Sequence, residues 1–274
     1  MSNSEKNQTA ASLAPLLGRV RDQRPLIHHI TNLVVMNDTA NITLAIGASP
    51  VMAHALEEVE EMVKLARALV LNIGTLTPEQ ILAMLRAGQR ANDLGIPIVL
   101  DPVGAGATSL RTQSALRLLR ELHISTIRGN ASEVGTLVGV AAETRGVDSI
   151  SLSEDREVVA SRAAREFACT VAITGPRDVI SDGKRLAYVD NGHPLLAAIT
   201  GSGCMATALV GAFLAIESDA WLATTAGLIA MGLAGEIAAP KAGGPGTFRS
   251  HLLDAVAALN EGTIVRGQKV SIVE

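Results

Sequence analysis

The chain has 274 residues, of which 48% are hydrophobic, and is long enough to bury a substantial core. It contains only three Phe, one Tyr and one Trp, and Ala, Val, Leu and Ile supply most of its apolar content, which favours helices packed on a buried parallel sheet over an all-β sandwich. The formal net charge of −4, with no long basic run and few aromatic residues, argues against a nucleic-acid partner and favours a small molecule.

The N-terminal segment is polar, and no apolar segment of the kind found in a secretory leader follows it. We expect residues 1–8 to be disordered. The chain has two cysteines, Cys169 and Cys204, which form no framework of paired spacings. We therefore predict reduced thiols and a cytoplasmic location.

A unit of amphipathic helix, short apolar strand and polar loop recurs along the chain. The predicted helices span residues 57–68, 78–94, 109–122 and 153–168, and the strands that follow them span 69–74, 96–102, 124–130 and 170–175. Strands joined by crossover helices form a parallel sheet with helices on both faces. Their carboxyl ends lie along one edge, which is where open α/β sheets bind ligands.

The rest of the chain continues the same domain. Asp182-Gly183 separates two short apolar segments within 176–190, which predicts a β-hairpin added to the sheet. Helices are predicted at 203–216, 219–239 and 247–260, and acidic residues interrupt their apolar tracts before the length of a membrane span is reached. We expect buried helices with no membrane role, and a single domain over residues 1–274.

A glycine-rich segment, Thr200-Gly201-Ser202-Gly203-Cys204, precedes the first of these three helices. Gly201 and Gly203 permit a tight turn, and the first turn of a helix offers unpaired N–H donors and a positive dipole end to an anion. A thiol at this position is expected to have a depressed pKa, so Cys204 is a candidate base. The alternative is a glycine-rich helix start with a small buried cysteine.

Polar residues follow the predicted strands. Asp101 ends one strand and is a candidate for organising Mg²⁺ or its waters, or else it caps the turn before Pro102. Asn130 and Glu133 share one face of a helix start, where they suit a hydrated Mg²⁺ or, alternatively, a capping box.

Two further residues at this edge suit a nucleotide. Arg128 offers a planar set of donors to a phosphate, although a surface arginine bonded to carbonyls is an alternative. Thr174 offers a hydroxyl to a phosphate or ribose. The chain has neither a P-loop motif nor a dinucleotide fingerprint, so phosphate binding is assigned to residues 201–204.

The N-terminal part carries candidate pocket residues. Asn32 and Met52 suit the lining of a small pocket, although each is also ordinary in a turn or a core. The adjacent His28 and His29 do not face one ligand on a strand, so we interpret them as packing or hydrogen-bonding residues and not as a metal site.

Together these segments resemble the hydroxyethylthiazole kinases, thiamin-salvage enzymes of the ribokinase-like superfamily, over residues 25–259. The matching motifs are His29-Ile30-Thr31-Asn32, Thr39-Ala40-Asn41, Gly47-Ala48-Ser49-Pro50-Val51-Met52, Leu71-Asn72-Ile73-Gly74-Thr75-Leu76, Asp101-Pro102-Val103-Gly104-Ala105-Gly106-Ala107-Thr108, Ile127-Arg128-Gly129-Asn130-Ala131-Ser132-Glu133, Ile173-Thr174-Gly175 and Thr200-Gly201-Ser202-Gly203-Cys204. Two departures are Asp38, where the family usually has an aromatic residue, and Ile42-Thr43, where Gly-Leu is more usual.

The resemblance implies a three-layer ribokinase-like α/β fold with a central, mostly parallel sheet and helices on both faces. It implies transfer of the ATP γ-phosphoryl group to the hydroxyl of 4-methyl-5-(2-hydroxyethyl)thiazole, with Mg²⁺, in a homotrimer whose thiazole sites lie between subunits. It places Met52 and Gly201 at the thiazole, with Asn32 added, and Arg128 and Thr174 at ATP. Related kinases have Asp at the position of Cys204.

The chemistry that follows uses Gly201, Gly203 and Cys204 for catalysis and Asp101, Asn130 and Glu133 for the metal, directly or through water. One alternative is a related enzyme that phosphorylates another hydroxyalkyl heterocycle or uses ATP in a dehydration. The other alternative is a non-catalytic protein that binds a thiazole or a nucleotide.

Overall fold

The computed structural model describes residues 14–140, 142–145, 148–152 and 155–273. The predicted disorder of residues 1–8 lies outside these residues. Within them, the main sheet has nine strands in the order β11-β10-β9-β8-β5-β4-β3-β1-β2, and β6 pairs with β7 in a separate sheet. The strands are β1 (Leu26–Ile30), β2 (Ser49–Val51), β3 (Ala68–Asn72), β4 (Ile98–Asp101), β5 (Thr126–Asn130), β6 (Ala142–Arg145), β7 (Asp148–Leu152), β8 (Thr170–Thr174), β9 (Asp178–Ser181), β10 (Leu186–Val189) and β11 (Val270–Val273).

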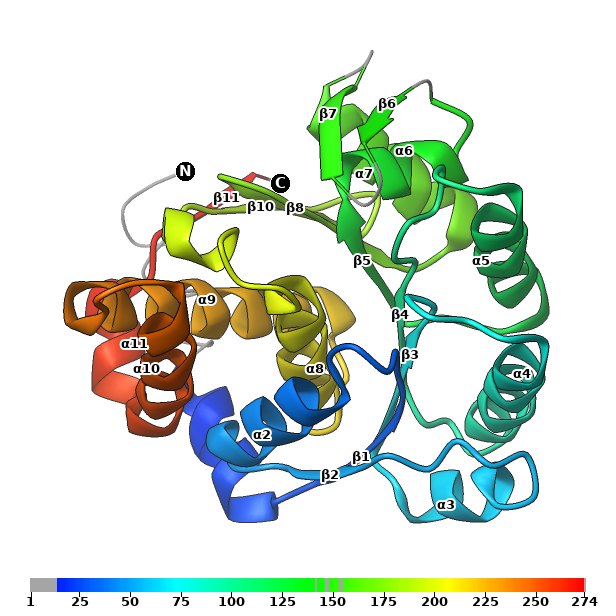
Figure 1. The fold of residues 1–274 in the computed structure, drawn as a ribbon, viewed down its shortest axis with the longest axis horizontal. Coiled ribbons are helices and arrows are strands. Elements are labelled where there is room, and N and C mark those ends of the chain that lie inside the picture. Colours follow the sequence, from blue (N-terminus) through cyan, green and yellow to red (C-terminus); the bar gives the residue numbers. More distant parts are fainter. Residues whose placement is uncertain (1–13, 141, 146–147, 153–154, 274) are drawn as a thin grey trace.

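Helices cover both faces of this sheet, in three layers (Figure 1). One face carries α2 (Met36–Ile46), α8 (Ser202–Leu214), α9 (Ala220–Ala238), α10 (Pro245–Ala258) and α11 (Glu261–Gly267), and the other carries α3 (Val59–Leu65), α4 (Pro78–Asp93), α5 (Ser109–Glu121), α6 (Ala131–Leu137) and α7 (Arg156–Phe167). Two hydrophobic clusters correspond to the two faces. The three-layer α/β prediction is confirmed.

The central strands are parallel, as the repeating units predict. β3, β4, β5 and β8 pair in parallel with one another. All five residues of β3 are buried, because helices cover both faces of the strand and leave no side chain for solvent. The predicted hairpin is also present, since β9 pairs with β10 antiparallel.

The structure adds β1 and β2 at one side of the parallel strands and β11 beyond the hairpin. None of these three strands is predicted by the sequence pattern. β1 reads as polar because it contains His28 and His29, yet both side chains are fully buried. β2 has only three residues, one of them Pro50. Proline has no N–H to donate, and an edge strand such as β2 tolerates this because, in the described part of the chain, no further strand needs that donor on its outer side.

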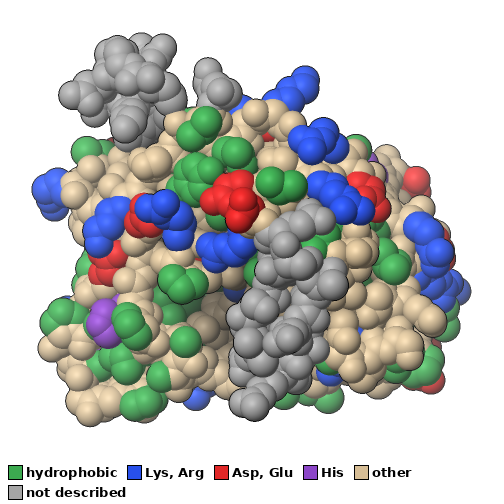
Figure 2. Space-filling view, turned by 90° about the horizontal axis from the view of Figure 1, so that it is seen from above, with side chains coloured by type: hydrophobic (Ala, Val, Ile, Leu, Met, Phe, Trp, Pro, Cys, Tyr) green, Lys and Arg blue, Asp and Glu red, His purple; other side chains and the backbone are tan. Residues whose placement is uncertain are grey.

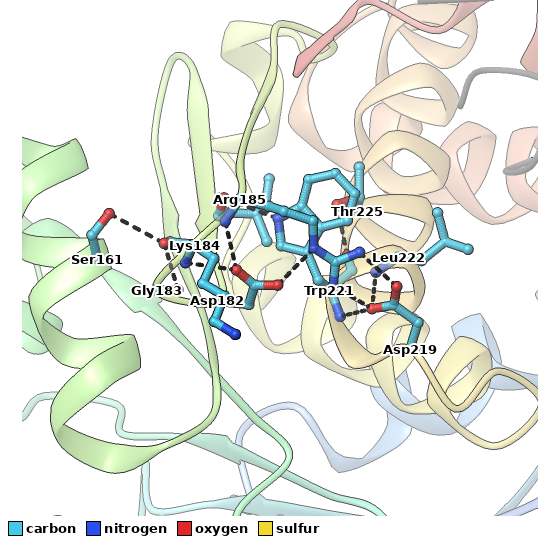
Figure 3. A network of polar contacts seen from close by, with 11 residues as sticks. Ser161, Asp182, Gly183, Lys184, Arg185, Asp219, Trp221, Leu222 and Thr225 are labelled. Atoms are coloured by element: carbon cyan, nitrogen blue, oxygen red, sulfur yellow. Dashed lines mark hydrogen bonds and ion pairs between the residues drawn. The ribbon is translucent and has the colours of Figure 1, made fainter. Parts of the chain in front are cut away.

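The hairpin turn is tied to the start of α9 by a polar network (Figure 3). Arg185 pairs with Asp182 of the turn at 2.6 Å and with Asp219, the N-cap of α9, at 2.8 Å. Its guanidinium lies 4.5 Å from the centre of the Trp221 ring. These contacts join the antiparallel part of the sheet to the helical layer.

The helices α8 and α9 are apolar on every side because other elements surround them. Contrary to the expectation that acidic residues keep these tracts shorter than a membrane span, the segment Ala220–Lys241 is long and apolar enough to cross a membrane, but 78% of its most apolar stretch is buried inside the fold. This agrees with the prediction of buried helices. On the face shown in Figure 2, Lys and Arg side chains lie among Asp and Glu side chains and do not gather into one basic patch.

Candidate active site

The candidate site lies where the parallel strands end and α8 begins. Asn72 of β3 is paired in register with Asp101 of β4, and Asn130 of β5 is paired with Thr174 of β8. Four polar side chains thus follow one another along the carboxyl edge of the sheet. The sequence prediction that these strand ends lie together is confirmed.

The start of α8 supplies backbone donors at this edge. Gly201 is the N-cap with φ 83°, and a Cβ there would lie 2.5 Å from Val35 Cγ1, so the position requires glycine. Gly203 approaches Arg128 so closely that a Cβ would lie 2.6 Å from its Nη1 atom. Gly201 provides no side-chain cap, which leaves the first-turn N–H groups available to an anion.

Cys204 lies in the first turn of α8 and is partly buried. Its Sγ accepts hydrogen bonds from Asn72 Nδ2 at 3.2 Å and Asn32 Nδ2 at 3.5 Å. Burial and the neighbouring Asp101 carboxylate raise the pKa of Cys204 to about 12. The expected depressed pKa is therefore wrong, because desolvation of the thiolate and repulsion by a carboxylate outweigh the donors around the sulfur.

Asp101 is fully buried, and its two oxygens differ. Oδ2 accepts from Thr207 Oγ1 at 2.8 Å and from Asn72 Nδ2 at 3.0 Å, and Arg128 Nη1 lies 3.8 Å away. Oδ1 is buried and has no hydrogen-bond partner within the described part of the chain. Burial raises the pKa of Asp101, although Arg128, Thr207 and Cys204 oppose the shift. An unpartnered carboxylate oxygen of this kind suits a cation or a proton.

Asn130 and Glu133 form the capping box that was the alternative to a metal site. Asn130 Oδ1 accepts from the Glu133 N–H at 2.9 Å, and Glu133 Oε2 accepts from the Asn130 N–H at 2.8 Å. Glu133 Oε1 accepts from the Gly104 N–H at 2.8 Å, so both carboxylate oxygens are in use. Burial and Asp101 raise the pKa of Glu133 to about 7. Among the described residues, no group of three His, Cys, Asp or Glu is placed to hold a metal ion.

Arg128 and Thr174 lie together in a cavity of about 710 Å³ next to the start of α8. Arg128 Nη2 donates to Thr174 Oγ1, and Arg128 Nε is buried without a partner among the described residues. Gly203 also lines the cavity, and its apolar wall includes Leu196, Leu228 and Met231. The cavity therefore combines a cation, a helix N-terminus and an apolar surface.

Asn32 and Met52 are positioned differently. Asn32 follows β1 and contacts Asn72 and Cys204, which places it at the site. Met52 follows the edge strand β2 and is half-buried. Its carbonyl oxygen lies 3.2 Å from His54 Nδ1, and no described hydrogen bond joins Met52 to Gly201 or Asn32. The role of Met52 therefore stays a prediction.

The two adjacent histidines have structural contacts. His28 Nε2 lies 2.8 Å from the Ala53 carbonyl oxygen, and His29 Nε2 lies 3.4 Å from Thr43 Oγ1. Burial lowers the pKa of His29 to about 3, so this side chain is neutral. The interpretation of these residues as packing and hydrogen-bonding groups is confirmed.

Comparison with known proteins decides the family. A model of the hydroxyethylthiazole kinase family matches residues 17–262. The chain is 53% identical to the hydroxyethylthiazole kinase of Roseiflexus castenholzii, with 96% of this chain and 97% of that protein covered. The chain belongs to the hydroxyethylthiazole kinase family.

Solved structures agree with this assignment. The structure of the hydroxyethylthiazole kinase protein from Pyrococcus horikoshii OT3 is similar at a TM-score of 0.89 and 48% identity, covering 96% of this chain and 99% of that one. A ribokinase-like superfamily protein from Enterococcus faecalis shares the fold at a TM-score of 0.62 and 12% identity, covering 86% and 87% of the two chains. This kinase therefore has a three-layer ribokinase-like fold.

The departures from the family pattern lie inside the packing of this kinase. Asp38 is buried, and its Oδ1 accepts from Arg249 Nε of α10 at 2.6 Å. Ile42 is fully buried in the core, and Thr43 Oγ1 donates to the Thr39 carbonyl oxygen at 2.7 Å. An ion pair thus joins α2 and α10 at Asp38.

A larger cavity, of about 1070 Å³, lies at the opposite, amino edge of the sheet. Its lining includes Asp182, Arg185 and Asp219, which pair with one another. None of the buried, unpartnered side-chain atoms found in the described residues belongs to this lining, whereas Arg128 belongs to the smaller cavity. The unsatisfied polar groups favour the carboxyl edge as the active site of the kinase.

Two residues of this site were not singled out from the sequence. Asn72 belongs to one of the family motifs, where it ends a buried strand two residues before Gly74. Thr207 lies three residues after Cys204 on the same face of α8, and its hydroxyl reaches Asp101. The sequence indicates the position of Thr207 only through its spacing of three residues from Cys204, which places both on one face of the helix.

Proposed function

We propose that this kinase transfers the γ-phosphoryl group of ATP to the hydroxyl of 4-methyl-5-(2-hydroxyethyl)thiazole, which yields 4-methyl-5-(2-phosphooxyethyl)thiazole for thiamin biosynthesis. The observation that carries the proposal is the position of the α8 N-terminus. The cavity with Arg128 and Thr174 adjoins it, and Asn32 contacts Cys204 in its first turn. A phosphoryl group bound there lies between a nucleotide and an alcohol.

The 710 Å³ cavity is proposed to bind ATP. Arg128 and Thr174 contact the phosphates, and the backbone N–H groups of residues 201–204 receive the transferred group. The apolar wall formed by Leu196, Leu228 and Met231 suits the base.

The thiazole is proposed to lie against Gly201, Asn32 and Met52, with a second copy of the chain completing the site in a homotrimer. Leu33 and Val34 directly follow Asn32 and are 71% and 63% exposed. Exposed apolar side chains beside a site are typical of a surface that another chain covers. Sedimentation velocity is expected to show a species of three times 28.4 kDa, and a monomer at assay concentration would contradict the shared site.

The metal proposal depends on Asp101. Its unpartnered Oδ1 atom fits a water bound to Mg²⁺, so the carboxylate is not a direct ligand and can still take up a proton, whereas the oxygens of Glu133 are occupied by backbone N–H groups. Asn130 and Glu133 therefore contribute only through water. When bound, Mg²⁺ supplies charge neutralisation at the phosphate oxygens.

The reaction proposed for these residues is an in-line displacement. The substrate oxygen forms a bond to the γ-phosphorus, and the bond from that phosphorus to the bridging oxygen of ADP breaks. Cys204 Sγ accepts the hydroxyl proton while the thiol proton passes to Asp101, whose pKa is raised by burial and to which Cys204 donates a hydrogen bond. Because the transition state is loose and the proton leaves late, a thiol is adequate for this task.

The location proposed for this kinase is the cytoplasm. Both cysteines, Cys169 and Cys204, are free, as expected in a reducing compartment.

The test measures ADP release by the purified protein with MgATP, with and without the thiazole alcohol, beside the variant Cys204→Ala. We expect thiazole-dependent turnover, and the variant is expected to retain turnover at about 10²-fold lower kcat. Turnover only with another alcohol indicates a related heterocycle as the substrate. Ligand binding without ADP release indicates a non-catalytic protein, and an unchanged kcat in the variant removes Cys204 from the mechanism.

A further inference from the structure

Asn72 joins three active-site residues, Asp101, Cys204 and Asn32, through one buried side chain. Its side chain is 1% exposed. Nδ2 donates to Asp101 Oδ2 at 3.0 Å and to Cys204 Sγ at 3.2 Å. Oδ1 accepts from Asn32 Nδ2 at 2.8 Å and from the Gly74 N–H at 2.9 Å. One buried amide thus uses two donors and two acceptor sites, which is its full capacity.

The orientation of this amide is fixed by backbone donors. The Gly74 N–H can only donate, so the atom of Asn72 that faces it must be the oxygen. The same holds for Asn32, whose Oδ1 accepts from the Val34 and Val35 N–H groups at 3.1 and 3.2 Å. Both amides therefore present N–H groups, and not oxygens, to the sulfur of Cys204.

We infer that Asn72 is a positioning residue that holds the sulfur of Cys204 in place for proton transfer from the substrate hydroxyl. The inference rests on the proposed function, in which Cys204 receives that proton. The two N–H···S hydrogen bonds select one orientation, and Asn72 makes the shorter of them.

A second action of Asn72, through Asp101, has to be separated from the first. The Nδ2 hydrogen bond to Asp101 Oδ2 is shared with Thr207, which holds the same oxygen at 2.8 Å. Thr207 therefore continues to orient the carboxylate when Asn72 is removed. The Sγ atom of Cys204, by contrast, loses the shorter of its two N–H donors and keeps only the 3.5 Å hydrogen bond from Asn32 Nδ2.

The test is a double-mutant cycle with Asn72→Ala and Cys204→Ala, read as kcat and as separate KM values for ATP and the thiazole alcohol. Asn72→Ala is expected to lower kcat about 10-fold and to change either KM less than about 3-fold. The double variant is expected to match Cys204→Ala, at about 10²-fold below the unmodified protein, because Asn72 has no sulfur left to position. Asn72→Ser, which lacks both amide donors, repeats the measurement with a polar hydroxyl in place of the apolar methyl group of alanine.

The matched control is Asn92→Ala. Asn92 also bridges two segments, through Nδ2 to the His123 carbonyl oxygen and Oδ1 from the His123 N–H, both at 2.8 Å, but it lies at the opposite edge of the sheet. We expect this variant to lose a hydrogen-bonded bridge between two segments, as Asn72→Ala does, with unchanged kcat.

The outcomes separate the two proposals. If Cys204→Ala lowers kcat and the effect of Asn72→Ala persists undiminished in the double variant, Asn72 acts elsewhere and the inference alone is overturned. An unchanged kcat in Asn72→Ala and Asn72→Ser overturns it as well. If Cys204→Ala leaves kcat unchanged, the proposed proton acceptor is wrong and the role of Asn72 is rejected with it.

Discussion

Replacement of Gly203 by alanine separates the stability of α8 from its function. Gly203 is the second residue of α8, and its φ lies outside the left-handed region, so alanine fits the backbone. In a helix, alanine is favoured over glycine by about 0.5–1 kcal/mol. The added Cβ, however, lies 2.6 Å from Arg128 Nη1 and 2.9 Å from Nη2, which forces the guanidinium to move.

The size of the functional effect follows from the contacts of Arg128. Its guanidinium donates to Thr174 and lies 3.8 Å from Asp101, so a displaced Arg128 leaves the position proposed to contact ATP. A hydrogen bond to a charged group contributes about 1.5–3 kcal/mol, which corresponds to roughly a 10- to 100-fold change in binding. We therefore predict that Gly203→Ala raises the KM for ATP by this factor, while its free energy of unfolding changes by less than about 1 kcal/mol.

The assay pairs steady-state kinetics with urea unfolding and uses Gly246→Ala as the control. Gly246 is likewise the second residue of its helix, α10, but an added Cβ there meets no atom within 4 Å. The control is expected to show the same small stability effect with unchanged KM values. If Gly203→Ala leaves the KM for ATP unchanged, the proposed contact between Arg128 and the nucleotide is refuted.

Three other predictions concern the same region. Arg128→Ala is expected to raise the KM for ATP about 100-fold and to change the thiazole KM less than about 3-fold, and an effect on the thiazole alone would show that Arg128 is misplaced. Gly201→Ala, at φ 83° with its Cβ 2.5 Å from Val35 Cγ1, is expected to lower the free energy of unfolding by about 2 kcal/mol, and an unchanged unfolding midpoint would contradict this. Burial raises the pKa of Asp178 from 3.8 to about 6. The protonated carboxyl group therefore favours the folded state fully below pH 3.8, and this contribution to the free energy of unfolding is lost as the pH rises through 6. In urea unfolding, the free energy of unfolding of the unmodified protein should fall between pH 5 and pH 8 by about 1 kcal/mol more than that of Asp178→Asn, which cannot titrate at this position. Equal falls in the two proteins would show that the pKa of Asp178 is not raised.

Local patterns in the sequence determined much of the fold. The alternation of amphipathic helices with strands such as β3 and β4 predicted the parallel core, because strand and helix periodicities are set by nearest neighbours along the chain. Asp182-Gly183 predicted the hairpin for the same reason. β1 was missed because its histidines are buried by elements that are distant in sequence.

The motifs also placed Asp101, Arg128, Thr174 and Cys204 at one edge, because parallel strands that share crossover connections end together. Only the tertiary structure decided what these groups do to one another. The sequence predicted a low pKa for the Cys204 thiol from the helix start alone, whereas burial and Asp101, which is contributed by a different strand, raise it. Charge and desolvation act through space, so they depend on which residues the fold brings into contact and not on their spacing along the chain.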